Sequence, residues 1–103
     1  MSAIDPASLD LGPAYARTAE FDETTVPNGL LAAHTTKAGT WGLIHVTDGQ
    51  LSYRIDDPRR PVSNVVLTPA SGPGVVEPTI EHSVKPVGKV RFYVAFHRQN
   101  PQP

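Results

Sequence analysis

The sequence predicts an all-β fold with a single domain, and three observations carry this prediction. Eleven prolines and eight glycines among 103 residues exclude long helices. Several stretches alternate apolar and polar residues, which is typical of strands with one buried face. Turn-forming residues separate these stretches at the spacing of a β-sandwich or barrel, so we expect seven or eight short strands.

Composition and charge exclude several classes of function. The net charge of −1 gives no electrostatic attraction to nucleic acid or to an anionic membrane. The chain has no cysteine, which excludes disulfides, thiolate metal sites and thiol nucleophiles. No apolar run reaches the ~20 residues of a membrane-spanning helix, and the N-terminus lacks the basic and apolar regions of a secretion signal. We therefore expect a cytoplasmic protein.

The chain divides into an N-terminal arm, residues 1–13, a β domain, residues 14–98, and a disordered tail, residues 99–103. Charge is uneven: residues 1–26 carry −4 and residues 27–103 carry +3. A small domain buries a modest core, and an exposed sheet edge invites pairing with another copy. We therefore expect a homodimer.

The first half of the domain predicts three strands. Ala14 to Val26 lacks breakers, and its threonines favour extended backbone. Leu30 to Lys37 alternates as a strand, and Trp41 to Thr47 follows as the next. Asp48-Gly49 predicts a tight hairpin, since a type I′ turn needs positive φ.

The second half predicts four more strands and the turns between them. Leu51 to Ile55 returns from the hairpin, and Val62 to Thr68 is a β-branched run after a charged loop. A proline- and glycine-rich turn follows. Glu81 to Val87 then alternates, Gly88 turns the chain, and Val90 to Phe96 closes the domain.

Two histidines are candidate metal ligands. His34 and His82 lie 48 residues apart, each on an alternating strand beside core-facing residues. Neutral imidazole binds zinc, iron, copper or nickel, so two strands of a barrel could direct both rings at one ion. The alternative is that both line the interior as hydrogen-bonded structural residues. His45 and His97 lie on faces whose burial the pattern does not settle, and each is open as a third ligand.

Three further residues are candidate ligand contacts. Lys37 stands at a turn where it could bind an anion, or it is simply solvated. Trp41 packs in the core or at a pocket rim. Arg91 either contacts a ligand or pairs with Glu77 or Glu81. The sequence contains no phosphate-binding glycine loop and no serine-centred elbow.

These residues resemble a known family. The segment from His34 to Gly42, HTTKAGTWG, resembles the H-x-T-K-x-G-T-W-G signature of small cupin-like domains related to tellurite-resistance protein B and to YeaR-like proteins. The Gly49 to Tyr53 segment matches the next element. Glu77-Pro78 with His82 and Val84 matches E-P-x-x-x-H-x-V. The closing strand matches at Arg91-Phe92, Val94, Phe96 and Arg98.

The resemblance implies a double-stranded β-helix, which is a small jelly-roll barrel. It places His34 and His82 in the position of a cupin metal pocket. Thr36 stands where a full cupin site has a second histidine, and the acidic ligand is absent near Trp41-Gly42. Some family members continue into a methyltransferase that acts on tellurite, an activity that is not carried over to this chain.

Three functions remain open at this point. The first is a domain that binds a metal ion or small oxyanion in its barrel and serves in stress or tellurite resistance. The second is a metal-dependent cupin enzyme of the dioxygenase or isomerase type, with one divalent transition metal and a third ligand such as His45 or His97. The third is a small-molecule-binding module without metal.

Overall fold

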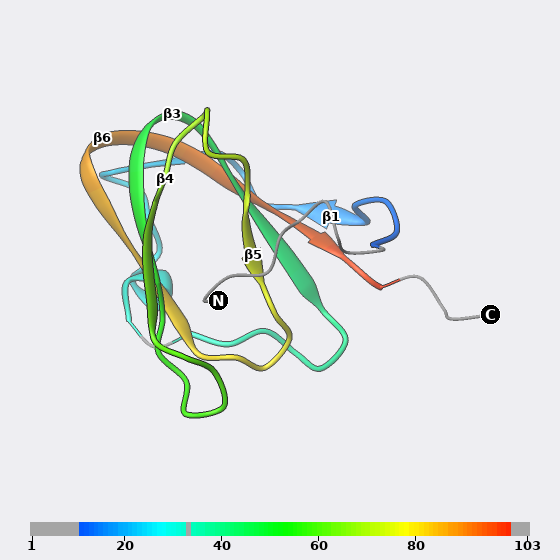
Figure 1. Ribbon diagram of the computed structural model, residues 1–103. Helices are drawn as coiled ribbons and strands as arrows, with labels where there is room; N and C mark the ends of the chain where they lie inside the picture. Colours follow the sequence, from blue (N-terminus) through cyan, green and yellow to red (C-terminus); the bar gives the residue numbers. More distant parts are fainter. Residues whose placement is uncertain (1–10, 33, 100–103) are drawn as a thin grey trace.

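A computed structural model describes residues 11–32 and 34–99 and confirms the all-β prediction (Figure 1). Residues 1–10 of the predicted arm and 100–103 of the predicted tail lie outside the described residues. Six strands form one antiparallel sheet in the order β1-β6-β3-β4, with β2 beside β6 and β5 beside β3. The strands are β1 (Ala16–Arg17), β2 (Phe21–Asp22), β3 (Trp41–Ile55), β4 (Ser63–Leu67), β5 (Gly74–Val76) and β6 (His82–His97).

The sheet is not closed, so the prediction of a closed jelly-roll barrel is not confirmed. β4 ends one side of the sheet and pairs only with β3 among the described strands. None of the helices in the described part of the chain is long and apolar enough to span a membrane.

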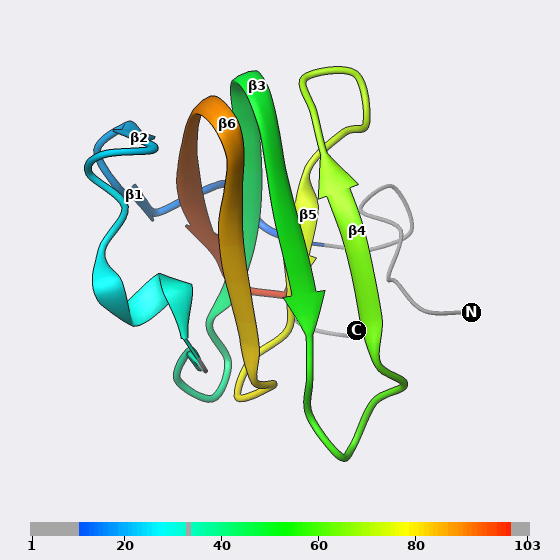
Figure 2. The same ribbon diagram turned by 90° about the vertical axis from the view of Figure 1, so that its left-hand side faces the viewer.

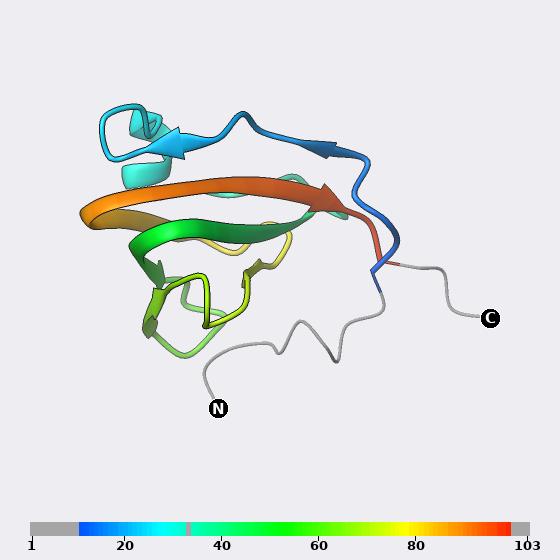
Figure 3. The ribbon, with the colours of Figure 1, turned by 90° about the horizontal axis from the view of Figure 1, so that it is seen from above.

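Two long strands make the framework, and both bend through a sharp angle (Figures 1 and 2). β3 and β6 pair along their whole length, from Trp41 opposite His97 to Ile55 opposite His82. The first half of β3 also pairs with β5, and its second half pairs with β4. The bend turns the two halves toward each other, so that one continuous pair of strands builds both walls of the core (Figure 3).

The predicted turns at Asp48-Gly49 and Gly88 are wrong, because both lie inside continuous strands. The register shifts between Val46 and Asp48, and Gln50 alone lies opposite the three residues 87–89 of β6. Gly49 has φ +77°, and a Cβ there would come within 2.0 Å of the Lys89 carbonyl oxygen. The positive φ that indicated a hairpin is instead used in a β-bulge that bends the strand pair.

The core lies on the concave face of this bent sheet. Apolar side chains alternate inward along much of β3 and β6, and Phe92, Leu51 and Val90 are the largest that are fully buried. The buried cluster consists of Ile44, Val46, Leu51, Tyr53, Leu67, Val76, Val84, Val90, Phe92 and Val94. The Tyr53 hydroxyl donates to the Val75 carbonyl oxygen at 2.7 Å, which ties the two walls together.

The segment before β3 crosses the open side of the core. It contains a 3₁₀ helix, Asn28–Leu31, in place of the first part of the strand predicted from Leu30 to Lys37. Leu30 packs against the core cluster. His34 alone makes a bridge to the sheet, opposite His82. A glycine and a proline beside Asn28 favour the tight turn over the strand that alternation indicated.

Candidate functional site

His34 and His82 lie directly opposite each other at the end of the sheet. The His34 amide donates to the His82 carbonyl at 2.8 Å, and the His82 amide donates to the His34 carbonyl at 2.9 Å. Residues opposed in this way on antiparallel strands direct their side chains to the same face. The sequence prediction that the two imidazoles lie close together agrees with this geometry.

The two rings pack edge to face. Their centroids are 5.3 Å apart and their planes meet at 83°. Tyr53 also packs edge to face against His82, with a ring-centroid distance of 5.9 Å. His82 is 4% exposed, whereas His34 is only partly buried. His82 is therefore the inner member of the pair, and His34 is the member nearer to solvent.

Both imidazoles line a small cavity over the concave face of the sheet. The cavity has a volume of about 60 Å³, enough for a few water molecules or a small ligand. None of its lining residues is charged, and apolar side chains predominate. The lining comprises Thr18, Leu30, His34, Thr36, Gly42, Ile44, Val76, His82, Val84, Phe92, Val94 and Phe96.

Burial keeps His82 neutral, and a hydrogen bond fixes which ring nitrogen carries the hydrogen. Its Nδ1 lies 3.1 Å from the Ile80 carbonyl oxygen, which accepts only if Nδ1 carries the hydrogen. The neutral ring then has its lone pair on Nε2. Burial lowers the pKa of His82, and the neighbouring His34 lowers it further, although the bond to Ile80 opposes both effects. At neutral pH His82 therefore offers an unprotonated nitrogen as acceptor or ligand.

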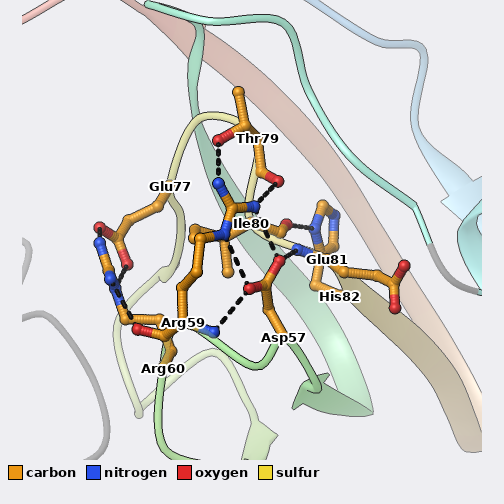
Figure 4. Close-up of polar contacts among 8 residues, drawn as sticks. All are labelled: Asp57, Arg59, Arg60, Glu77, Thr79, Ile80, Glu81 and His82. Carbon is orange, nitrogen blue, oxygen red and sulfur yellow. Dashed lines mark hydrogen bonds and ion pairs between the residues drawn. The ribbon is translucent and has the colours of Figure 1, made fainter.

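A buried carboxylate holds the loop that leads into His82 (Figure 4). Asp57 is 6% exposed and accepts from the Glu81 amide at 2.9 Å. The Arg59 guanidinium donates to both oxygens of this carboxylate, each at 2.9 Å, and lowers the pKa of Asp57 well below its usual range. Arg59 also donates to the Thr79 carbonyl oxygen at 2.6 Å. The Asp57–Arg59 pair thus fixes the backbone on either side of Ile80.

The same loop carries the one non-glycine residue with positive φ in the described part of the chain. Thr79 has φ +66°, a conformation that costs a β-branched residue energy. Its amide donates to the Thr36 carbonyl at 3.1 Å, two residues after His34. The bond that Arg59 donates to Thr79 and the bond that Thr79 donates to Thr36 therefore hold a strained turn between the two histidine-bearing segments. Beside it, Arg60 forms a bidentate pair with Glu77 at 2.7 Å.

Sequence reasoning missed this network. Asp57, Arg59 and Arg60 lie in a segment that reads as a charged loop, which is usually solvated. Their partners, Glu77 and Thr79, are about 20 residues further along the chain. The signal available was the Glu77-Pro78 turn just before His82, which marked a loop of fixed geometry but not its partner.

The histidine pair provides two metal donors and no third. Two imidazoles on one tetrahedral ion, at metal–nitrogen distances of ~2.0–2.1 Å, have ring centres about 5 Å apart. The observed 5.3 Å fits that spacing. Within residues 11–32 and 34–99, however, no group of three or more His, Cys, Asp or Glu residues could hold an ion. The pair therefore suits only an ion that takes its remaining ligands from solvent or from a bound molecule.

The other two histidines lie on the opposite, convex face of the sheet. His45 stacks on Tyr93 at 4.9 Å, and Arg17 covers the Tyr93 ring at 4.1 Å. Burial lowers the pKa of His45, and His97 and Arg17 lower it further. The Nδ1 of His97 lies 2.8 Å from the Gly12 carbonyl oxygen. The structure does not bring either ring to the cavity.

The three predicted ligand contacts also lie away from the cavity lining. Lys37 is exposed in a turn, where its carbonyl accepts from the Thr40 amide. Trp41 is half-buried opposite His97. Arg91 is exposed and lies 3.8 Å from Glu20, rather than near Glu77 or Glu81. Their role as ligand contacts stays a prediction.

Comparison with known proteins places this arrangement in a family. The sequence model of the TehB-like domain matches residues 16–94. The crystal structure of TehB from Haemophilus influenzae matches with a TM-score of 0.77 and 25% identity, over 87% of this chain and 32% of that one. This chain therefore spans about a third of the length of that protein.

A second solved structure shares the fold. It is a structural genomics target from E. coli (strain K12), which matches with a TM-score of 0.74 over 98% of this chain and 100% of that one. Its 18% identity shows the fold alone. No curated protein matches the chain.

Proposed function

This chain belongs to the TehB-like domain family, and we propose that it is a ligand-binding domain whose site is the cavity over His34 and His82. One observation carries the proposal. Two directly paired imidazoles, one of them held neutral by burial, are the main polar groups in a cavity otherwise lined largely by apolar side chains. Such a cavity with a few convergent polar groups is the usual form of a small-molecule site.

The lining selects the class of ligand. A full charge without a partner is costly in an apolar cavity, and no charged side chain among the described residues lines this one. The ligand is therefore small and carries a hydroxyl or other group that donates a hydrogen bond to the Nε2 of His82. A protonated oxyanion meets this requirement.

A divalent transition metal is the second candidate, favoured by the 5.3 Å spacing of the two rings. His34 and His82 would hold zinc, iron, nickel or copper, which would supply a Lewis acid there. With two protein ligands, coordination positions are left for water or a substrate. The dioxygenase or isomerase type of cupin enzyme would use the site in this form, whereas the metal-free module would use the imidazoles only as hydrogen-bonding groups.

The family supports a role in tellurite resistance or a related stress response, with tellurite as the first oxyanion to test. We place this role in the cytoplasm. The bent pair β3 and β6, with a strand added to each half, also supports a cupin-like double-stranded β-helix that has stayed open on one side.

Binding measured by calorimetry tests the proposal. Zinc, nickel and tellurite are titrated separately into wild-type protein without a histidine tag, and into His34→Ala, His82→Ala and His45→Ala. His45→Ala is the matched control, because it removes an imidazole from the opposite face. We expect one probe to bind the wild type and the control, and each inner variant to lose at least about tenfold in affinity. Equal affinity in all four proteins, or binding by none, would refute the proposal.

A further inference from the structure

The outer edge of β4 is unpaired among the described strands. β4 pairs with β3 along one edge over five consecutive residues, and it forms the margin of its half of the sheet (Figure 2). The strand at the other end of the order, β1, has only two residues. An unpaired edge of this length presents a row of backbone donors and acceptors to any other strand.

β4 lacks the features that usually protect an edge strand. Its sequence, Ser63–Leu67, contains no charge and no proline, and its pairing with β3 has no bulge. Native proteins normally place lysine, proline or a bulge on an edge to prevent association. The charged residues around it are already paired within the chain: Arg54 with Asp56, Arg59 with Asp57, and Arg60 with Glu77.

Two exposed valines mark the same strand. Val62, immediately before β4, is 60% exposed, and Val66 within it is 50% exposed. Both lie on the solvent face with Asn64 between them, because alternate residues of a strand share a face. Exposed valines near both ends of a short, uncharged edge strand indicate a surface that is covered in the working protein.

We propose that β4 pairs with β4 of a second copy of this chain, antiparallel, about a two-fold axis at Asn64. Opposed residues must share a face if the sheet is to continue, so their numbers must sum to an even value. A sum of 128 places Asn64 opposite the partner's Asn64. It also places Val62 opposite the partner's Val66, so that each of the four exposed valines packs laterally against a valine of the other copy.

The ends of the strand limit the ladder to this length. Pro61, which has no amide hydrogen, falls opposite the partner's Leu67, so the pairing covers residues 62–66. An axis at Val65 would instead leave each exposed valine opposite a polar residue, Asn64 or Thr68.

A second copy suits this edge better than an unrelated strand. The strand carries no charge and its neighbouring charges are paired, so two identical edges meet without like-charge repulsion. A two-fold axis also uses both free edges at once and leaves neither available for further growth.

Cross-linking tests the register directly, because the chain has no cysteine of its own. Opposed residues of an antiparallel pair have Cα atoms about 4.5–5.5 Å apart, within disulfide range. Asn64→Cys should form a disulfide-linked dimer when oxidised glutathione is added to dilute protein. Val87→Cys, at a 44% exposed site in the bend of β6 and outside the proposed ladder, should remain mostly monomeric on a non-reducing gel. Equal cross-linking of both variants, or none at Asn64→Cys, would overturn the register.

Oligomeric state tests the surface. Val66→Lys should weaken the dimer at least about tenfold in a dilution series by light scattering, whereas the matched change Val87→Lys should leave it intact. Melting curves of both variants confirm that they are folded. A wild-type monomer at all concentrations, or a Val66→Lys variant as dimeric as wild type, would overturn the proposal.

Discussion

The two faces of the bent sheet each carry a pair of histidines, and only the pair on the concave face lines a common cavity. On the concave face, His34 and His82 are opposed residues whose rings lie 5.3 Å apart beside a cavity. On the convex face, His45 opposes Tyr93 and stacks on it, whereas His97 opposes Trp41 and has its Nδ1 2.8 Å from the Gly12 carbonyl oxygen.

The difference lies in the bend rather than in the histidines. A sheet face becomes a container only where the sheet curves around it, and the bulges near Gly49 curve β3 and β6 toward the concave side. Identical side chains on the convex side stack or hydrogen-bond there, but they do not line the cavity. Changes at the bend should therefore affect the inner pair, whereas changes on the convex face should not.

The largest effect should follow from Gly49→Ala. The new Cβ would lie 2.0 Å from the Lys89 carbonyl oxygen, at a φ of +77° that side chains other than glycine disfavour. We expect the free energy of unfolding to fall by about 3 kcal/mol or more, and ligand binding to weaken with it. Gly88→Ala is the matched control, since its φ is also positive but its Cβ would meet no atom within 4 Å. Chemical denaturation of both variants measures this, and equal losses would show that the bend does not depend on close packing at Gly49.

The next effect separates the two histidine pairs. His82→Ala removes a buried ring and leaves the Ile80 carbonyl without its donor, so we expect a loss of about 2–3 kcal/mol in unfolding free energy. His45→Ala removes a half-buried stacked ring and should cost about 1 kcal/mol or less. Urea denaturation provides both values. A larger loss of unfolding free energy at His45 than at His82 would contradict the assignment of His82 as the more deeply buried and better supported histidine.

Acid should destabilise the protein through protonation of His82. Because burial lowers the pKa of His82 in the folded state, the unfolded chain binds a proton more tightly. Stability is then fully present above the unfolded value of about 6.5 and falls as pH drops below it, by about 1.4 kcal/mol for each unit of pKa difference. Melting temperature between about pH 7.5 and 5 should fall less steeply in His82→Gln than in wild type. Parallel slopes would mean that His82 does not titrate differently on folding.

The smallest effect should come from Arg91→Ala on the convex face. Its side chain is 65% exposed and pairs with Glu20 at 3.8 Å, so the pair contributes below about 0.5 kcal/mol. Ligand affinity should be unchanged, because Arg91 does not line the cavity. A clear loss of affinity by calorimetry would instead support the sequence prediction that Arg91 contacts the ligand.

The sequence predicted local strand character well and long-range arrangement poorly. Alternation identified the faces of β3 and β6, because burial on one face acts on every second residue. It could not distinguish a hairpin from a bulge at Gly49, since both use positive φ. The same ambiguity at Gly88 turned two long strands into four predicted short ones.

For the candidate site, too, the sequence predicted the local part well and the long-range part poorly. His34 and His82 could be assigned to one interior from alternation and from the family signature. The cavity around them depends on the bend, and the support of His82 depends on Asp57 and Arg59 in a loop about 20 residues from its partners. Contacts of that kind arise when distant loops meet, and no local pattern encodes them.

The most direct test of the account is an NMR titration that follows all four imidazoles together. Wild-type protein with labelled histidines is titrated with the probe that binds by calorimetry, and each ring is assigned by its alanine variant. The account predicts that the signals of His34 and His82 shift together with one affinity while those of His45 and His97 stay in place. Shifts confined to the convex pair, or a response of only one inner ring, would contradict it.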